Sequence, residues 1–244
     1  RDWSSDVCSS DLNYKLMRVN KLYRFLCPII TILLLTGCLS KPQTKLSFAI
    51  KYQGKIQSCQ QLDPSLMFYL SNFRQAKALT IESQKYSNSS VALIGANCNA
   101  ESWQLILLEE VTAGETLSFD IGVPFELNHA NPLTAPAPLN ISEMFWSWQL
   151  GHKFLRLDAK DYSFHLGSTG CQSPSRMRPA NSPCQHPNRF TFTINKYQVN
   201  KPIIFDLDAL VNNIDTSTSC MSDQQNDNCQ ILFTLLRTPL FYQE

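Results

Sequence analysis

The segment ETLSFDIGV (residues 115–123) decides the fold class, because apolar and polar side chains alternate along it. Residues two apart in a β-strand lie on the same face, so one face of this segment is apolar and the other is polar. The segments LSFAIKY (46–52) and RFTFTIN (189–195) repeat this alternation, and shorter apolar runs lie at 66–70, 91–94, 105–108, 203–207 and 231–236. Many short strands with Asn, Ser, Gly and Pro between them predict an all-β fold, an antiparallel β-sandwich or barrel-like single domain.

The segment NISEMFWSWQ (140–149) departs from this alternation. Asn140 and Glu143 have the spacing of a capping box, which predicts one short helix that ends near Gly151, and the strand KFLRLDAK (153–160) follows. Between an apolar strand that ends at His129 and this helix lie three prolines, Pro132, Pro136 and Pro138. Proline fixes φ and removes a backbone donor, so we expect a stiff loop that holds both of its ends in place.

The first 37 residues are predicted to lie outside the folded domain. Residues 1–16 form a leader, of which residues 2–12 look like translated adapter sequence. Residues 17–37 combine a basic start, an apolar run too short to span a bilayer and Leu-Thr-Gly directly before Cys38. This pattern resembles a bacterial lipobox and predicts a lipoprotein signal peptide, with a lipid on the thiol of Cys38.

After cleavage, residues 38–45 form a tether and residues 46–244 form the β domain. Leu39, in place of an aspartate after the lipid-bearing cysteine, favours the outer membrane of the bacterial cell envelope. Removing the five basic and three acidic residues before Cys38 from totals of 21 and 20 leaves 16 basic and 17 acidic residues, a net charge of −1. This balance gives no reason to expect a nucleic-acid partner.

The sequence lacks the local motifs of the common enzyme classes. It contains no Ser-x-x-Lys, no Gly-x-Ser-x-Gly, no His-Glu-x-x-His and no phosphate-binding glycine loop. Nothing in the sequence nominates a pair of carboxylates for hydrolysis. We therefore expect a protein that is not an enzyme.

The cysteines indicate a disulfide framework. Cys8 and Cys27 fall in the leader and the signal peptide, and Cys38 carries the lipid, so six remain: Cys59, Cys98, Cys171, Cys184, Cys220 and Cys229. An even number in an exported protein predicts disulfides, although sequence alone does not choose the connectivity. Cys171/Cys184 and Cys220/Cys229 are close enough to staple two long polar loops, which leaves Cys59/Cys98. Zinc is the alternative, but no Cys-x-x-Cys spacing occurs.

Three histidines fall near the ends of predicted elements, where metal ligands can converge: His129, His152 and His165. The fourth is His186. A histidine at a strand end is more often a structural residue than a ligand, so this arrangement alone leaves both roles open. Core packing is likewise the ordinary role of the three tryptophans after Cys38, which are Trp103, Trp146 and Trp148.

Several strings resemble the MbnP-like family of periplasmic or lipid-anchored copper-binding proteins. They occupy residues 122–129, 131–140, 144–148, 153–157 and 164–171, and the similarity is densest from about residue 111 to residue 171. YLSNFR (69–74) and Cys220-Met221 resemble an early strand and a late Cys-Met of the family. The resemblance implies an all-β domain encoded beside a MauG-like di-heme peroxidase, which oxidises one tryptophan of its partner to kynurenine.

The resemblance also assigns site residues. His129 and His165 lie inside matching strings and are the expected copper ligands, and His152, which stands where the family usually has an aromatic residue, is a third candidate. Trp103 is the candidate for the modified tryptophan by its position in the mature chain. Trp146 and Trp148 match the family string and are expected to pack beneath the proline loop.

The sequence therefore predicts a lipid-anchored, extracytoplasmic copper-binding protein for metal acquisition or handling. It would be the substrate of a di-heme partner rather than an enzyme. The alternative is an envelope scaffold or adhesion lipoprotein, stapled by disulfides, in which the histidines are structural and no metal binds.

Overall fold

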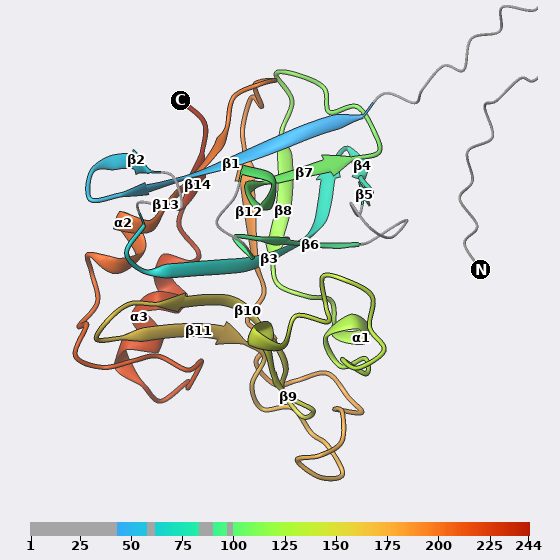
Figure 1. The fold of residues 1–244 in the computed structure, drawn as a ribbon, viewed down its shortest axis with the longest axis vertical. Helices are drawn as coiled ribbons and strands as arrows, with labels where there is room; N and C mark the ends of the chain where they lie inside the picture. Colours follow the sequence, from blue (N-terminus) through green and yellow to red (C-terminus); the bar gives the residue numbers. More distant parts are fainter. Residues whose placement is uncertain (1–42, 58–61, 83–89, 97–99) are drawn as a thin grey trace, which may run out of the picture. The chain divides into compact units, whose positions relative to one another are not determined.

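A computed structural model describes residues 43–57, 62–82, 90–96 and 100–244 of the chain (Figure 1). The chain divides into two units, Arg1–Ser40 and Lys41–Glu244, and all of the described residues belong to the second. The predicted leader and signal peptide lie outside the described residues, as do Cys38, Cys59 and Cys98. Within the described ranges, no helix is both long and apolar enough to cross a membrane.

Short strands make up most of the second unit. They are β1 (Thr44–Tyr52), β2 (Lys55–Gln57), β3 (Ser65–Gln75), β4 (Lys77–Ala78), β5 (Ile81–Glu82), β6 (Val91–Ile94), β7 (Gln104–Leu107), β8 (Leu117–Ile121), β9 (Phe145–Ser147), β10 (Gly151–Asp158), β11 (Ser163–Gly167), β12 (Phe190–Ile194), β13 (Ile203–Asp206) and β14 (Phe241–Tyr242). The α-helices are α1 (Phe125–Asn128), α2 (Leu207–Val211) and α3 (Asp227–Leu235), and the 3-10 helices are η2 (Ala100–Trp103) and η3 (Ser142–Met144).

The strands form two sheets. The six-stranded sheet has the order β14-β13-β1-β7-β5, with β2 paired to β1. The eight-stranded sheet has the order β11-β10-β3-β8-β12, with β4 and β6 paired to β3 and β9 paired to β10. Among the described strands every pairing is antiparallel except that of β1 with β13. The predicted all-β sandwich class is confirmed, although with three short α-helices in place of one.

The alternating segments of the sequence become β1, β8 and β12, and their apolar faces form the core between the sheets. Phe119 of β8 pairs with Phe192 of β12 in the same sheet. Its ring also meets Phe48 of β1 across the sandwich, edge-on at 6.3 Å between centroids. One side chain thus contacts both layers, which is the packing that strict alternation predicts.

The expectation of a strand at 231–236 is wrong, because this run lies in α3 and its C-terminal end. Asn226 caps the helix, its side chain accepting a hydrogen bond from the backbone N–H of Cys229 at 3.0 Å. The buried positions recur at helical spacing: Asn228, Cys229, Leu232, Phe233 and Leu236. The N-terminal cap and the spacing of three to four residues between buried positions therefore predict this segment better than its short run of β-branched and apolar residues.

The predicted helix after Asn140 is also wrong in form. Only η3 is helical, its N-terminal flanking residue is Ile141, and the chain then extends into β9, which pairs with β10. His129 does not end a strand either, because residues after β8 turn into α1 and His129 is its C-cap. The backbone pairing of β9 with β10 fixes the extended form of residues 145–147.

The proline loop is fixed at both ends, as its composition predicted. The hydroxyl of Tyr69, on the central strand β3, donates to the carbonyl of Pro138 at 3.0 Å. At the start of the loop, the backbone N–H groups of Thr134 and Ala135 both bond to the carbonyl of Asn131. The loop therefore rests on a buried strand, and Figure 1 places α1, β9 and the long loop after β11 at the same end of the unit.

Two predicted disulfides are present, Cys171–Cys184 and Cys220–Cys229. The first closes the polar loop after β11. The second joins the segment before α3 to the first turn of that helix. Both staple loops that carry little apolar surface of their own, as expected for long connections in a compact domain.

Candidate metal centre

His129 is held by a single helical turn. As the C-cap of α1 its backbone N–H bonds to the carbonyl of Phe125 at 3.1 Å, and the two rings lie 4.6 Å apart between centroids. The side chain is buried, at 8% exposure. The helix is too short to be stable by itself, so the imidazole owes its position to packing against neighbouring segments.

The two ring nitrogens of His129 have different surroundings. Nε2 lies 3.3 Å from Nδ2 of Asn128 and 3.5 Å from Sγ of Cys184. The Asn128 amide is oriented by its other bonds, because Oδ1 accepts from the backbone N–H of His152 and Nδ2 donates to the carbonyl of Leu150. The second amide proton thus faces Nε2, which makes Nε2 an acceptor and places the ring proton on Nδ1. Nδ1 is buried and has no hydrogen-bond partner among the described residues.

Burial lowers the pKa of His129, and the nearby His152 lowers it further, while the backbone of Trp148 opposes the shift. Removal from water disfavours the charged form of a base, so the ring is neutral at physiological pH. A neutral imidazole is the form that binds metals.

His152 is completely buried, and both of its ring nitrogens face backbone carbonyl oxygens. Nε2 lies 2.9 Å from the oxygen of Leu139 and Nδ1 lies 3.2 Å from that of Asn128. Burial lowers its pKa, although both carbonyls act in the opposite direction. A neutral ring carries one proton, and the shorter contact identifies Nε2–H as the donor. His152 thereby ties the end of the proline loop to the end of α1.

His165 lies on β11, opposite Arg156 of β10. Its Nε2 donates to Oδ1 of Asp158 at 2.8 Å, which leaves Nδ1 as the acceptor of the neutral ring. Burial lowers the pKa of His165 and the Asp158 carboxylate partly offsets this. Burial by itself raises the pKa of Asp158, but hydrogen bonds from Ser163 and His165 lower it overall. A carboxylate that orients an imidazole in this way is the usual support of a metal-binding histidine.

The structure brings two of the three predicted histidines together. Asn128 bonds to the ring of His129 and to the backbone and ring of His152. No described contact joins His165 to either of them. Its partner Arg156 is four residues along β10 from His152, which corresponds to roughly 13 Å of strand.

The tryptophans lie in two places. Trp103, at the end of η2, is buried, packs edge-on against Phe68 at 6.1 Å, and has an indole nitrogen without a partner among the described residues. Trp146 is half-buried and meets the ring of His165 edge-on at 6.4 Å. Trp148 contacts Phe145, whose ring contacts His152. Trp146 thus contacts His165 directly, and Trp148 reaches His152 through Phe145. None of the described contacts of Trp103 is with a histidine.

Three features of this region were not anticipated from sequence: the Asn128 link, the Asp158 partner of His165 and the disulfide beside His129. Asp158 had a signal, because a tight turn at 159–162 places residues 158 and 165 across one hairpin. Asn128 and Cys184 had none, since Asn128 lies at the end of a helix of four residues that the sequence did not predict and Cys184 lies in an irregular loop.

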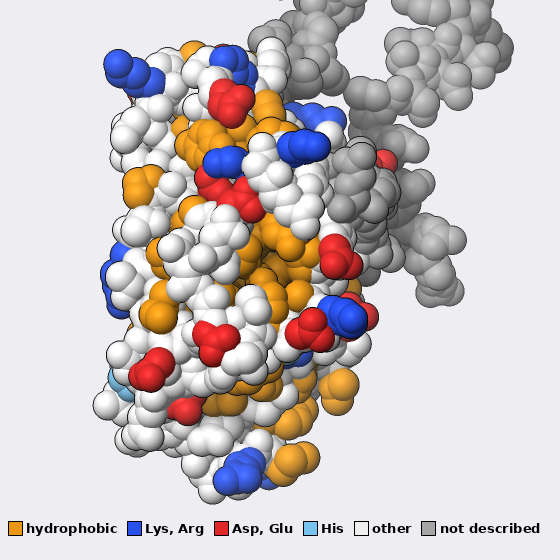
Figure 2. All heavy atoms as spheres, turned by 90° about the vertical axis from the view of Figure 1, so that its left-hand side faces the viewer, with side chains coloured by type: hydrophobic (Ala, Val, Ile, Leu, Met, Phe, Trp, Pro, Cys, Tyr) orange, Lys and Arg blue, Asp and Glu red, His pale blue; other side chains and the backbone are white. Residues whose placement is uncertain are grey.

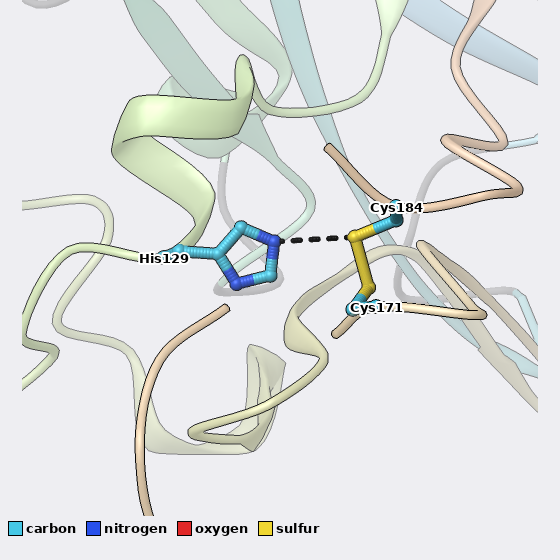
Figure 3. Close-up of side chains that lie close together, drawn as sticks. All are labelled: His129, Cys171 and Cys184. Atoms are coloured by element: carbon cyan, nitrogen blue, oxygen red, sulfur yellow. Dashed lines mark hydrogen bonds between the residues drawn. A yellow bond between two sulfur atoms is a disulfide. The ribbon is translucent and has the colours of Figure 1, made fainter. Parts of the chain in front are cut away.

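The disulfide Cys171–Cys184 lies against His129 (Figure 3). The imidazole nitrogen and the two sulfurs all lie within 4.8 Å of one another, and all three residues are buried. In this state the sulfurs are bonded to each other, so the imidazole is the strong donor of the group. Thiolates, not disulfide sulfurs, are the ligands that soft metals take.

The surface carries no single-sign field on the face that Figure 2 shows. Lys and Arg side chains are interspersed there with Asp and Glu, with apolar side chains between them. This agrees with the near-zero charge balance of the sequence and gives no basic patch for nucleic acid on that face.

Two comparisons with known proteins find the same family name. A family model described as MbnP matches residues 42–230. The solved structure of MbnP from Methylosinus trichosporium superposes with a TM-score of 0.64 at 22% sequence identity, over 79% of this chain and 87% of that one. No curated protein matches the chain. At 22% identity the solved structure supports the fold alone, and the assignment to a family rests on the family model.

Proposed function

The chain belongs to the MbnP family, whose model matches residues 42–230, and on that premise we propose that it binds copper outside the cytoplasm, in metal acquisition or handling. The observation that carries the proposal is His129. It is a buried imidazole of lowered pKa, with a ring nitrogen that has no partner among the described residues. Nδ1 makes no hydrogen bond of ordinary geometry to a described residue, and the Trp148 backbone gives its proton only a weak contact, so a metal ion that replaces this proton breaks little.

The donor set fits copper. Imidazole suits copper in both common oxidation states, and copper stands at the top of the divalent affinity order. His165 is the second proposed ligand, with Nδ1 free to coordinate because Asp158 fixes the proton on Nε2. No described contact joins His129 and His165, so in this proposal copper binding brings the two rings together. His152, the third candidate, could bind copper through Nε2 only if its hydrogen bond to the carbonyl of Leu139 were broken.

A di-heme, MauG-like peroxidase is the proposed partner, which would oxidise one tryptophan to kynurenine. The new carbonyl and aromatic amine would add donors near the histidines. Trp103 is the candidate by position in the chain, and the ring contact of Trp146 with His165 makes Trp146 the site-proximal comparison. In this proposal the protein is a substrate and not an enzyme, and Cys38 anchors it by lipid to the cell envelope, in the outer membrane.

Copper titration tests the proposal. Oxidised protein, with both disulfides intact, is titrated with Cu(I) against a competing chelator, alone and after co-expression with the peroxidase. We expect His129→Ala and His165→Ala each to lower affinity by about tenfold or more, as loss of a ligand or its support does. His186→Ala is the matched control, because the described bonds of His186 are made by its backbone.

Parent-like affinity in both His129→Ala and His165→Ala would overturn the copper proposal and favour the scaffold alternative. Peptide mass mapping of the co-expressed protein locates the modification. Kynurenine formation adds about 4 Da to a tryptophan, through loss of one carbon and gain of one oxygen. A tryptophan mass unchanged by the peroxidase would remove that partner from the proposal.

A further inference from the structure

We propose that reduction of the Cys171–Cys184 disulfide creates a second metal-binding state, in which Nε2 of His129 and two thiolates hold one soft cation. The inference deepens the proposed function and rests on it in one respect, namely that His129 is a ligand. It uses Nε2 of His129 rather than Nδ1, however, together with two thiolates that the oxidised protein lacks.

The distance from His129 to the disulfide is that of a ligand pair. Nε2 lies 3.5 Å from Sγ of Cys184. With metal–nitrogen and metal–sulfur bonds of about 2.0 and 2.3 Å, two ligands of a tetrahedral ion are separated by about 3.5 Å. The nitrogen and the first sulfur are therefore already spaced for coordination, and only the two sulfurs must separate.

The unprotonated nitrogen of His129 faces this place. The Asn128 amide donates toward Nε2, and Sγ of Cys184 lies 3.5 Å from the same nitrogen, so a metal that binds there takes the lone pair from the Asn128 hydrogen bond. No change of tautomer is needed before a metal binds between the ring and the sulfur. Phe125 and Leu150 pack around the two cysteines and keep the surroundings apolar, which strengthens a thiolate–metal interaction.

The cysteines would stay together after the bond opens. Backbone hydrogen bonds join Thr169 with His186, Gly170 with Gln185 and Gln172 with Asn181 across the two segments. The side chain of Gln149 also donates to the carbonyl of Cys171 at 2.8 Å. These bonds bracket the disulfide on both sides, so the thiols remain adjacent and the site is preorganised.

The chemistry balances with a dithiol reductant. One thiolate of the reductant attacks a sulfur of the disulfide, and the second closes the reductant into its own disulfide. Two electrons and two protons pass to Cys171 and Cys184, and the metal then displaces the two thiol protons. Two thiolates and one imidazole form a set that favours Cu(I) and other soft ions over hard ones.

The second disulfide supplies an internal control. Within the described part of the chain, Cys220–Cys229 belongs to no group of three potential ligands, whereas His129, Cys171 and Cys184 do. The imidazole of His165, whose backbone N–H bonds to the carbonyl of Cys220, is itself bonded to Asp158. Reduction of that bond should therefore yield thiols without a matching site.

The experiment uses Cd²⁺ as a soft, redox-inert probe and follows the ultraviolet thiolate-to-metal charge-transfer band. Protein is treated with a dithiol, the opened thiols are identified by alkylation and peptide mapping in a parallel sample, and Cd²⁺ is added to the unalkylated protein after the reductant is removed. We expect one equivalent bound, about tenfold or more tighter than by the oxidised protein. Cys171→Ser/Cys184→Ser should lose the band, His129→Ala should weaken binding at least about tenfold, and Cys220→Ser/Cys229→Ser should bind like the parent.

Two results would overturn the proposal. One is a Cys171–Cys184 bond that stays closed at reductant concentrations that open Cys220–Cys229 in the folded protein. The other is an equal charge-transfer band in the parent and in Cys171→Ser/Cys184→Ser. If either occurs while the oxidised protein still binds copper through His129, this inference fails and the proposed function stands.

Cys171→Ser keeps a permanent thiol on Cys184 beside His129, so it tests the nitrogen–sulfur pair without any reduction. It should bind Cd²⁺ with a weaker band that His129→Ala removes.

Discussion

His152 shows how a buried imidazole links the site to the stability of the fold. Its pKa is lowered in the folded protein, mainly by burial, from an ordinary value of about 6.5. As pH falls below that value, the unfolded chain takes up the proton first, so unfolding becomes easier. The stability is fully present above about pH 6.5 and declines as pH falls through the interval down to the folded pKa.

We therefore expect the free energy of unfolding to decline below pH 6.5, by at most about 1.4 kcal/mol per pH unit for each proton involved. His152→Gln retains an amide donor for the carbonyl of Leu139 but cannot titrate, so it should have a shallower slope. Urea denaturation at a series of pH values measures both. His186→Gln is the matched control, and an unchanged slope in His152→Gln would show that His152 does not couple protonation to folding.

At this scale the sequence predicted the residue types but not the partners. Three histidines at element ends were recognisable, and the family resemblance selected His129 and His165 as ligands. The contacts that define their chemistry come from far along the chain, with a sequence separation of 55 between His129 and Cys184 and of 24 between Asn128 and His152. No local pattern encodes those distances, because irregular loops set them.

At the scale of elements, the start of β10 has no room for a side chain at Gly151, so a substitution there should disturb the site. Gly151 adopts a φ of +78°, and a Cβ placed on it would lie 2.4–2.5 Å from the carbonyl oxygen and the side chain of Asn128. Asn128 in turn orients His129 and His152. The glycine is thus required both by backbone conformation and by close approach.

Gly151→Ala should destabilise the protein more than Gly54→Ala. Gly54 has a similar φ of +72° but open space around it, so both variants carry the same conformational cost of about 1–2 kcal/mol. The clash with Asn128 should add about 1–3 kcal/mol at position 151. Urea denaturation gives the difference, and equal losses would mean that Asn128 moves aside freely. Copper affinity should also fall in Gly151→Ala alone.

Elements were predictable where burial is one-sided. β1 and β12 follow the alternation of their sequences because each presents one face to the core and the other outward, whereas on β8 the outward Asp120 is buried and accepts hydrogen bonds from Asn72, Arg189 and Thr191. The segments at 140–149 and 231–236 were assigned wrongly, since in each a local signal pointed one way and the tertiary context the other. At 140–149 the capping-box spacing predicted a helix, but pairing with β10 made residues 145–147 a strand. At 231–236 the β-rich run predicted a strand, but the cap at Asn226 begins a helix that includes it.

At the scale of the whole molecule, the C-terminal strand joins the two sheets. Phe241 on β14 stacks on Phe205 of the six-stranded sheet at 4.8 Å between centroids. It also contacts Phe192, Phe119 and Phe68 of the eight-stranded sheet, at 4.8, 5.2 and 6.0 Å. In Figure 1, α1 and β9, which carry or flank the proposed metal centre, lie away from β14. The Phe241 cluster and the site can therefore be tested by separate mutations.

Phe241→Ala should cost about 3–5 kcal/mol, because it removes a ring that is 2% exposed and leaves a cavity between the layers. That is a large share of the 5–15 kcal/mol typical of a folded domain, so the urea midpoint should shift strongly while the protein still folds at 25 °C. Tyr242→Ala, on the adjacent and more exposed face of β14, is the matched control and should cost less.

The folded fraction of Phe241→Ala should keep its copper affinity. A loss no greater than that of Tyr242→Ala would show that the sheets are joined elsewhere, and a parallel loss of copper affinity would show that the core and the site are coupled.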